Sequence, residues 1–123
     1  MAEFSIKAGD LVPSITATLE DENGLAIDIQ DAIVTFVLTL RITEAGEVID
    51  GEAPTVESAA DNLQVAGEEE TNGQVEYLWV EGDTDIPGGY RGEWRVDFAD
   101  GPGTFPNNRY LSIEIEPALG GGS

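Results

Sequence analysis

Cysteine and histidine are both absent from the 123 residues of the chain. Without cysteine there is no disulfide, no thiolate metal site and no cysteine nucleophile. Without histidine the chain lacks the commonest general base and the nitrogen ligand of most zinc, copper and iron sites. Catalysis would have to depend on carboxylates, lysine, tyrosine or a bound ion, and we expect the protein not to be an enzyme.

Basic residues are scarce, because 25 acidic side chains face five basic ones and the formal net charge is -20. Such a surface repels phosphate backbones, which argues against nucleic acid as a partner. The acids are dispersed, with 68–70 the longest run, so they do not form a disordered acidic tail. A dispersed acidic excess is expected of proteins in concentrated salt, where a Debye length of about 3 Å at 1 M screens self-repulsion. The charge favours a halophilic source, and an ordinary acidic protein is the alternative.

Long apolar runs are missing as well. The longest, AIVTFVLTL at 32–40, is much shorter than the roughly 20 apolar residues of a membrane helix. The first residues, MAEFSIKAGD, contain no basic region followed by an apolar stretch and do not resemble a signal peptide. We therefore expect no membrane insertion.

Apolar and polar residues alternate with a period of two in most segments, which predicts an all-β chain. The expected strands lie at 14–21, 25–29, 32–43, 74–80, 90–98 and 109–116. Inward-facing residues are expected at alternate positions of these strands: Ile15, Ala17, Leu19, Leu25, Ile27, Ile29, Val34, Phe36, Leu38, Leu40, Ile42, Val75, Tyr77, Trp79, Tyr90, Gly92, Trp94, Val96, Phe98, Leu111, Ile113 and Ile115.

Two segments are less regular. For 55–73 the pattern allows a short strand at 62–66 or a helical turn near 56–61, and 99–108 has the composition of a turn. About seven short antiparallel strands, with turn signals roughly every ten residues, predict a β-sandwich of two sheets. We expect one domain at 1–117 and a flexible glycine-rich tail at 118–123.

The segment EGDTDIPGG at 81–89 is the one candidate for a metal site. Glu81, Asp83 and Asp85 supply three hard oxygen ligands within five residues, a set that suits Ca²⁺. The spacing is not that of an EF-hand, because the twelfth residue from Asp83 is Trp94. Aspartates in turns also bond nearby backbone amides. We favour the structural turn over the ion site, and we expect no catalytic residues and no cofactor.

Three other features have a structural and a functional interpretation. Trp79 and Trp94 are expected in the core, and exposure of either would indicate a ligand surface. Arg91, Arg95 and Arg109 could form a basic spot for an acidic partner, although pairing with the chain's own acids, such as Glu93 and Glu114, is favoured. Paired carboxylates could cleave glycosidic bonds, but with so many acids some will be neighbours by chance.

The order of short motifs along the chain resembles a known family. These motifs are GD..P....TL.D..G..ID from residue 9, DA.V.F.L from residue 31, and G.V.Y.W..GDTD.PG.Y..E..V.F.DG...FPN..Y..I.I from residue 73. Together they span Phe4 to Ile115 and resemble the immunoglobulin-like domain at the amino end of the baseplate upper protein of tailed phages, which also occurs in other virion proteins. The threonine that usually follows GD is Leu11 here.

The resemblance implies an immunoglobulin-like sandwich that builds or decorates virus particles through protein contacts and has no catalytic residues. It implies a place on the tail, baseplate, neck or capsid surface of a tailed virus. The acidic charge, independently of the resemblance, favours a halophilic archaeal host for that virus. The expected partners are other virion proteins and copies of the same chain. A carbohydrate- or cell-surface-binding module for host attachment, with a host glycan as its ligand, is the alternative.

Overall fold

The computed structural model describes residues 4–49, 54–105 and 111–117, and this part of the chain is built mainly from β-strands. The same residues contain no α-helix, only a 3-10 turn at Glu69–Thr71, and nothing helical that is long and apolar enough to cross a membrane. The strands are β1 (Phe4–Lys7), β2 (Ile15–Thr18), β3 (Ile33–Thr43), β4 (Val56–Asn62), β5 (Gln74–Tyr77), β6 (Gly88–Phe98), β7 (Gly101–Phe105) and β8 (Leu111–Glu116).

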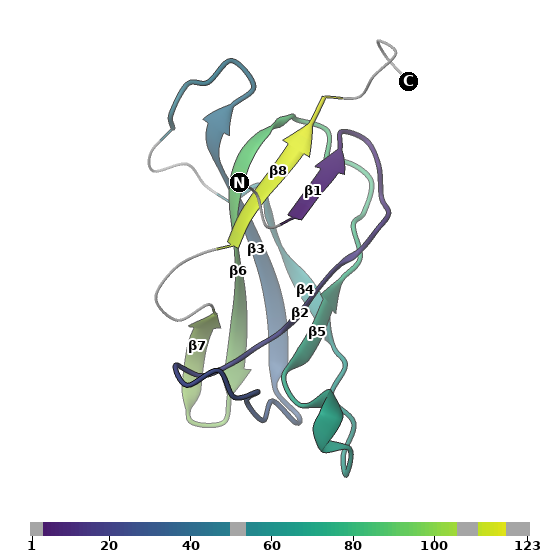
Figure 1. Cartoon of the computed structure of the whole chain (residues 1–123), viewed down its shortest axis with the longest axis vertical. Coiled ribbons are helices and arrows are strands. Elements are labelled where there is room, and N and C mark those ends of the chain that lie inside the picture. Colours follow the sequence, from purple (N-terminus) through teal and green to yellow (C-terminus); the bar gives the residue numbers. More distant parts are fainter. Residues whose placement is uncertain (1–3, 50–53, 106–110, 118–123) are drawn as a thin grey trace.

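The antiparallel pair of β3 and β6 is the centre of the structure. Both strands have 11 residues, and they pair along nearly their whole length. The other edge of β6 is shared: β8 pairs with its first half and β7 with its second half. Figure 1 shows β8 beside one end of β6 and β7 beside the other. Beyond β8 lies β1, which runs parallel to it.

A second group of strands, β2 and β5, is connected to the first through β4. The first part of β4, Val56–Ala60, pairs with β3, and its last two residues, Asp61 and Asn62, pair with β5. The strand order is β1-β8-β6-β3-β4-β5-β2, with β7 attached to β6. The all-β class is confirmed, and the arrangement is consistent with a sandwich-like fold. The eight described strands form one continuous hydrogen-bonded sheet and include a parallel pairing, whereas the sequence predicts about seven antiparallel strands in two sheets.

Most of the core consists of inward-facing residues that the alternation predicts, but it also contains Ile6, Val56 and Phe105, which the alternation does not predict. On β6 the exposure alternates from residue to residue, with Tyr90, Trp94 and Val96 buried and the arginines between them half-buried. Five aromatic rings come together in this core. They belong to Phe4, Phe36, Tyr77, Trp79 and Trp94, and the ring centroids of neighbouring members lie 4.8 to 6.0 Å apart.

Residues 56–62 and 101–105 depart from the sequence prediction. The first segment forms β4, so both the helical turn near 56–61 and the strand at 62–66 are wrong. Only Val56 of this strand is fully buried, and its alanines give no clear alternation. Its conformation follows from hydrogen bonding to β3. The second segment, expected as a turn, forms β7 against β6.

The expected strand at 25–29 does not form, and only Ala26 makes an isolated bridge, to Glu20. The first part of the segment bonds the backbone of 19–21, where the Ile27 amide donates to the Leu19 carbonyl at 3.0 Å. At its end, side chains at and just after the end of β4 bond the backbone of Ile29. The Asn62 amide donates to the carbonyls of Ile29 and Ala32, at 2.7 and 3.1 Å, and the Ile29 amide donates to the Gln64 side chain at 2.8 Å. Ile29 is fully buried as predicted, whereas Leu25 is 64% exposed.

Ile42 was expected to face inward but is 44% exposed. A register shift between Leu40 and Ile42 in the pairing of β3 with β6 is the cause. Because side chains alternate with a period of two, one extra residue moves every following side chain to the opposite face. Leu40 therefore lies opposite the buried Tyr90, and Ile42 lies opposite Gly89.

Replacing Gly73 by alanine is expected to destabilise the fold strongly. Gly73 has a φ of +74°, and a Cβ there would lie 2.5 Å from the backbone oxygen of Leu19. Gly24→Ala is the matched control, because its φ is +81° with no atom within 4 Å. The left-handed conformation costs each variant about 1–2 kcal/mol, and the clash costs Gly73→Ala roughly 1–3 kcal/mol more. Urea unfolding measures both, and equal losses would contradict the packing at Gly73.

Candidate functional site

The connection between β5 and β6 contains the candidate metal ligands. It includes a turn at 81–84, in which the Asp83 amide donates to the Val80 carbonyl at 3.0 Å. The Asp83 carboxylate closes this turn from the other side: Oδ2 accepts from the Val80 amide at 3.0 Å and from the Tyr77 hydroxyl at 2.5 Å. Asp83 is therefore occupied in joining the turn to the end of β5.

The other two candidate ligands, Glu81 and Asp85, are exposed. Within residues 4–49, 54–105 and 111–117, no three or more acidic, cysteine or histidine residues are grouped so as to hold a metal ion. One carboxylate of the proposed Ca²⁺ set thus has a structural role, and the geometry does not gather the three. The arrangement matches the structural turn that the sequence favours.

Thr84 is the residue of this connection that sequence reasoning missed. It is fully buried, and its hydroxyl donates to the Asp10 carbonyl at 2.9 Å and accepts from the Gly9 amide at 3.1 Å. The Gly9 amide is also 3.1 Å from the Thr84 carbonyl oxygen. The GD at 9–10 and the GDTD at 82–85 are thereby joined, although they lie far apart in the sequence. The one sequence signal for this contact was that the dipeptide GD occurs in both segments, at 9–10 and at 82–83.

Trp79 makes a second contact between the same two regions. Its indole Nε1 donates to the Pro13 carbonyl at 3.1 Å, and the side chain is only 4% exposed. Trp94 is 1% exposed, and its Nε1 has no hydrogen-bond partner in the described part of the chain, so packing holds it in place. Both tryptophans lie in the core, as the structural interpretation predicted, and neither presents a ring to a ligand.

Two buried tyrosines flank the connection. Burial, together with the hydrogen bond and negative charge of Asp83, raises the pKa of Tyr77 above its ordinary value, although a bond involving Ser58 opposes the shift. Burial also raises the pKa of Tyr90, whose hydroxyl donates to the Ile86 carbonyl at 2.6 Å. Both phenols are therefore held in the neutral form, in which each donates one hydrogen bond to the turn region.

The expected arginine cluster is only partly described. Arg95 forms an ion pair with Glu57 of β4 at 2.7 Å. The partner is an acid of the same chain, as the sequence favours, but it is neither Glu93 nor Glu114. Arg91 is half-buried on the same face of β6. Arg109 lies outside the described residues, as does the tail at 118–123.

The acidic side chains of the described part also have structural contacts. Hydrogen bonds from the Gln30 backbone amide and from the Gln64 side chain lower the pKa of the Asp28 carboxyl below its ordinary value, and a smaller effect of burial opposes them. Lys7 pairs with Glu116 at 3.1 Å, across the parallel strands β1 and β8. These contacts stabilise loops and edges, and they do not converge on a common cleft.

Comparison of the chain with models of protein families, with curated proteins and with solved structures gave no match.

Thr84→Val is expected to loosen the junction of the two GD motifs. Valine keeps the shape and removes the hydroxyl, so the Asp10 carbonyl loses its bond to Thr84 and the Gly9 amide keeps only its bond to the Thr84 carbonyl. The expected loss is about 1–3 kcal/mol of unfolding free energy. Thr18→Val, at an exposed site on β2, is the control and should change stability by less than about 0.5 kcal/mol. Denaturant unfolding compares the two, and equal effects would show that the Thr84 hydroxyl contributes nothing.

Proposed function

We propose that the chain is a non-enzymatic structural module of a tailed-virus particle, which acts through contacts with other virion proteins. The observation that carries the proposal is the role of the family motifs within the fold. Residues of the early GD..P motif bond residues of the later W..GDTD motif through Thr84 and Trp79. The motifs that resemble the virion family thus hold the domain together, as expected of a module whose shared residues maintain shape.

The strand order supports an immunoglobulin-like interpretation of the sandwich. In such domains the third and sixth strands are neighbours, the seventh lies beside the sixth, and the second pairs with the fifth. Here β3, β6 and β8 are neighbours in that order, and β2 pairs with β5. The bond from Tyr90, near the start of β6, to a carbonyl four residues earlier corresponds to the tyrosine corner of these domains.

Binding through surfaces also agrees with the distribution of polar groups. Both tryptophans are buried, and within the described residues the candidate metal ligands do not converge. The acidic excess is a surface property that keeps the module hydrated and sets which partners approach it. No observation favours the glycan-binding alternative, since its expected sign was an exposed tryptophan.

Particles purified from the source organism should contain the chain as a stoichiometric component. Mass spectrometry of gradient-purified particles tests its presence, and electron microscopy of the same particles locates the eight-stranded body on the tail, baseplate, neck or capsid surface. A marker protein from the host cytosol, followed through the same gradient, controls for contamination. Absence of the chain from intact particles would refute the proposal.

We also propose that the protein works in concentrated salt. With a net charge of -20, self-repulsion should lower its stability at low ionic strength, and about 2 M NaCl should raise the unfolding free energy by roughly 2 kcal/mol. Replacing the three glutamates at 68–70 by glutamine should shrink this gain. Urea unfolding in low and high salt measures it, and a wild-type stability that does not depend on salt would contradict the halophilic origin.

A further inference from the structure

A shallow groove lies where residues 43–46, which follow the bulge in β3, face the end of the β5–β6 connection. After the bulge, Ile42 and Thr43 lie opposite Gly89 and Gly88 of β6. The two strands pack closely there, because a Cβ on Gly88 would lie 2.6 Å from the Ile42 oxygen. The groove lies beside this close contact, and we call it the bulge groove.

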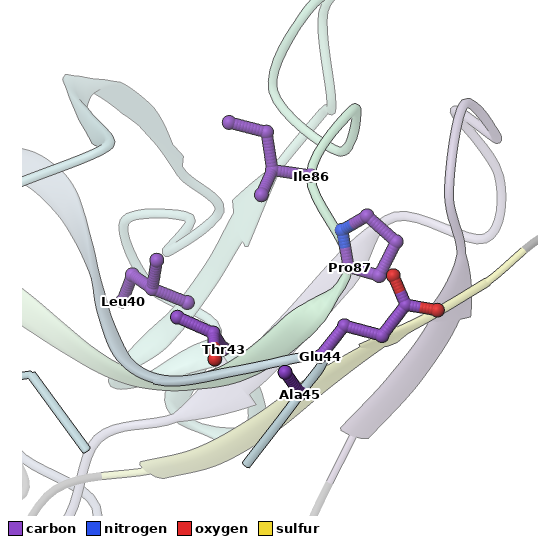
Figure 2. Close-up of a pocket in the computed structure, with 6 residues that line it drawn as sticks. All are labelled: Leu40, Thr43, Glu44, Ala45, Ile86 and Pro87. Carbon is purple, nitrogen blue, oxygen red and sulfur yellow. The ribbon is translucent and has the colours of Figure 1, made fainter. Parts of the chain in front are cut away.

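The bulge groove consists of two adjoining hollows of about 450 and 460 Å³, which share Thr43, Glu44 and Pro87. Figure 2 shows the first, with Ile86 and Pro87 across from Leu40, Thr43 and Ala45. Ile86 is 59% exposed, so an apolar surface is open to solvent on this wall. The bond from the Tyr90 hydroxyl to the Ile86 carbonyl fixes the backbone of the same wall.

The charged residues that line the bulge groove are all acidic. Glu44 lies in both hollows and Glu114 in the second, and no lysine or arginine lines either. Neither glutamate forms an ion pair with another described residue, in contrast to Glu57 and Glu116. The groove therefore presents an apolar floor with unneutralised carboxylates beside it.

This combination selects the kind of partner. A second copy of the chain would bring another net charge of -20 to the groove, which opposes association. A cationic segment could pair with the glutamates of the groove at contact distance, where concentrated salt screens least. It could also place an apolar side chain against Ile86 and Leu40. Charge complementarity therefore favours a basic protein segment over a copy of the chain.

We propose that the bulge groove binds a basic segment of a neighbouring protein, with one apolar side chain inserted beside Ile86 and flanking lysine or arginine residues paired with Glu44 and Glu114. The proposal rests on the proposed function, since it supplies the chemistry of a partner within the particle. Insertion in the groove fixes the position of the segment, and the surrounding acids strengthen its approach.

The test uses the full chain, labelled with ¹⁵N, and a synthetic peptide of alternating lysine and leucine as the probe. We expect saturable shifts in the amide resonances of 42–46, 86, 88–89 and 114–115. A lysine-serine peptide tests charge without the apolar side chain, and a glutamate-leucine peptide tests the apolar side chain without positive charge. Both should bind at least about tenfold more weakly.

Variants of the chain separate the groove from general acidity. Ile86→Ser should weaken binding of the lysine-leucine peptide about tenfold, and Glu44→Gln should weaken it and reduce its salt dependence. Leu25→Ser is the matched control, because Leu25 is 64% exposed and lies near Asp21 and Glu22 but outside the groove. It should leave the affinity unchanged, and an unfolding curve for each variant confirms that it is folded.

Three results would overturn the proposal: shifts spread over the acidic surface, equal affinity for the lysine-serine peptide, or no effect of Ile86→Ser. A dimer in sedimentation that Ile86→Ser abolishes would instead assign the groove to a second copy. The proposed function fails separately. If particles contain the chain with the groove facing solvent, the groove proposal fails alone, and if groove-specific binding occurs but particles lack the chain, the viral role fails alone.

Discussion

The packing of Phe36 against three other aromatic rings is the contact on which the fold depends. Phe36 comes from the central strand β3 and is fully buried, with the rings of Tyr77, Trp79 and Trp94 at 5.0, 5.8 and 4.8 Å. Those rings come from β5, the residues after it and β6, so one side chain contacts both groups of strands. Each such pair contributes about 0.5–1.5 kcal/mol beyond the burial of its area. Because successive side chains of a strand point to opposite faces, strands that direct these rings inward direct the carboxylates between them outward.

The sequence predicted best the strands in which large apolar residues alternate with polar ones, as in β6. It failed where hydrogen bonding decides the conformation. β4 is a strand because β3 pairs with it. The segment 25–29 does not continue as a strand, and the backbone of Ile29 bonds the side chains of Asn62 and Gln64. The prediction also placed Ile42 inward, because it continued the alternation past Arg41. The bulge at this point cannot be recognised from the order of apolar and polar residues. A register shift is set by the partner strand, which a local pattern does not contain.

The candidate site also contains one feature that the sequence could predict and others that it could not. A structural role for Asp83 could be expected, because short acidic side chains commonly bond turn amides. The burial of Thr84 could not, because one small polar residue in a connection has no periodicity and its partners at 9–10 are distant in the sequence. The bulge groove was likewise beyond prediction, since its walls come from residues around the bulge in β3 and from 86–89, which meet only in the folded chain.

The acidity of the chain has two structural aspects. Some carboxylates bond other side chains of the same chain. The pairs are Asp83 with Tyr77, Glu76 with Ser14, and Glu57 with Arg95. Five basic residues are too few to neutralise 25 acids, so most of the charge faces water, ions or neighbouring molecules. A domain of this kind can remain hydrated in concentrated salt and still attract cationic surfaces at close range.

The parallel pairing of β1 with β8 has a mechanical consequence. The first and last described strands lie side by side and in the same direction, joined over four residue pairs and by the bridge from Lys7 to Glu116. A pull at the beginning of β1 and an opposite pull at the end of β8 would slide the two strands along each other. The force would then act on all the hydrogen bonds between the two strands at the same time, in shear, and would not break them one after another. Tension along these two strands would therefore load all of their hydrogen bonds at once.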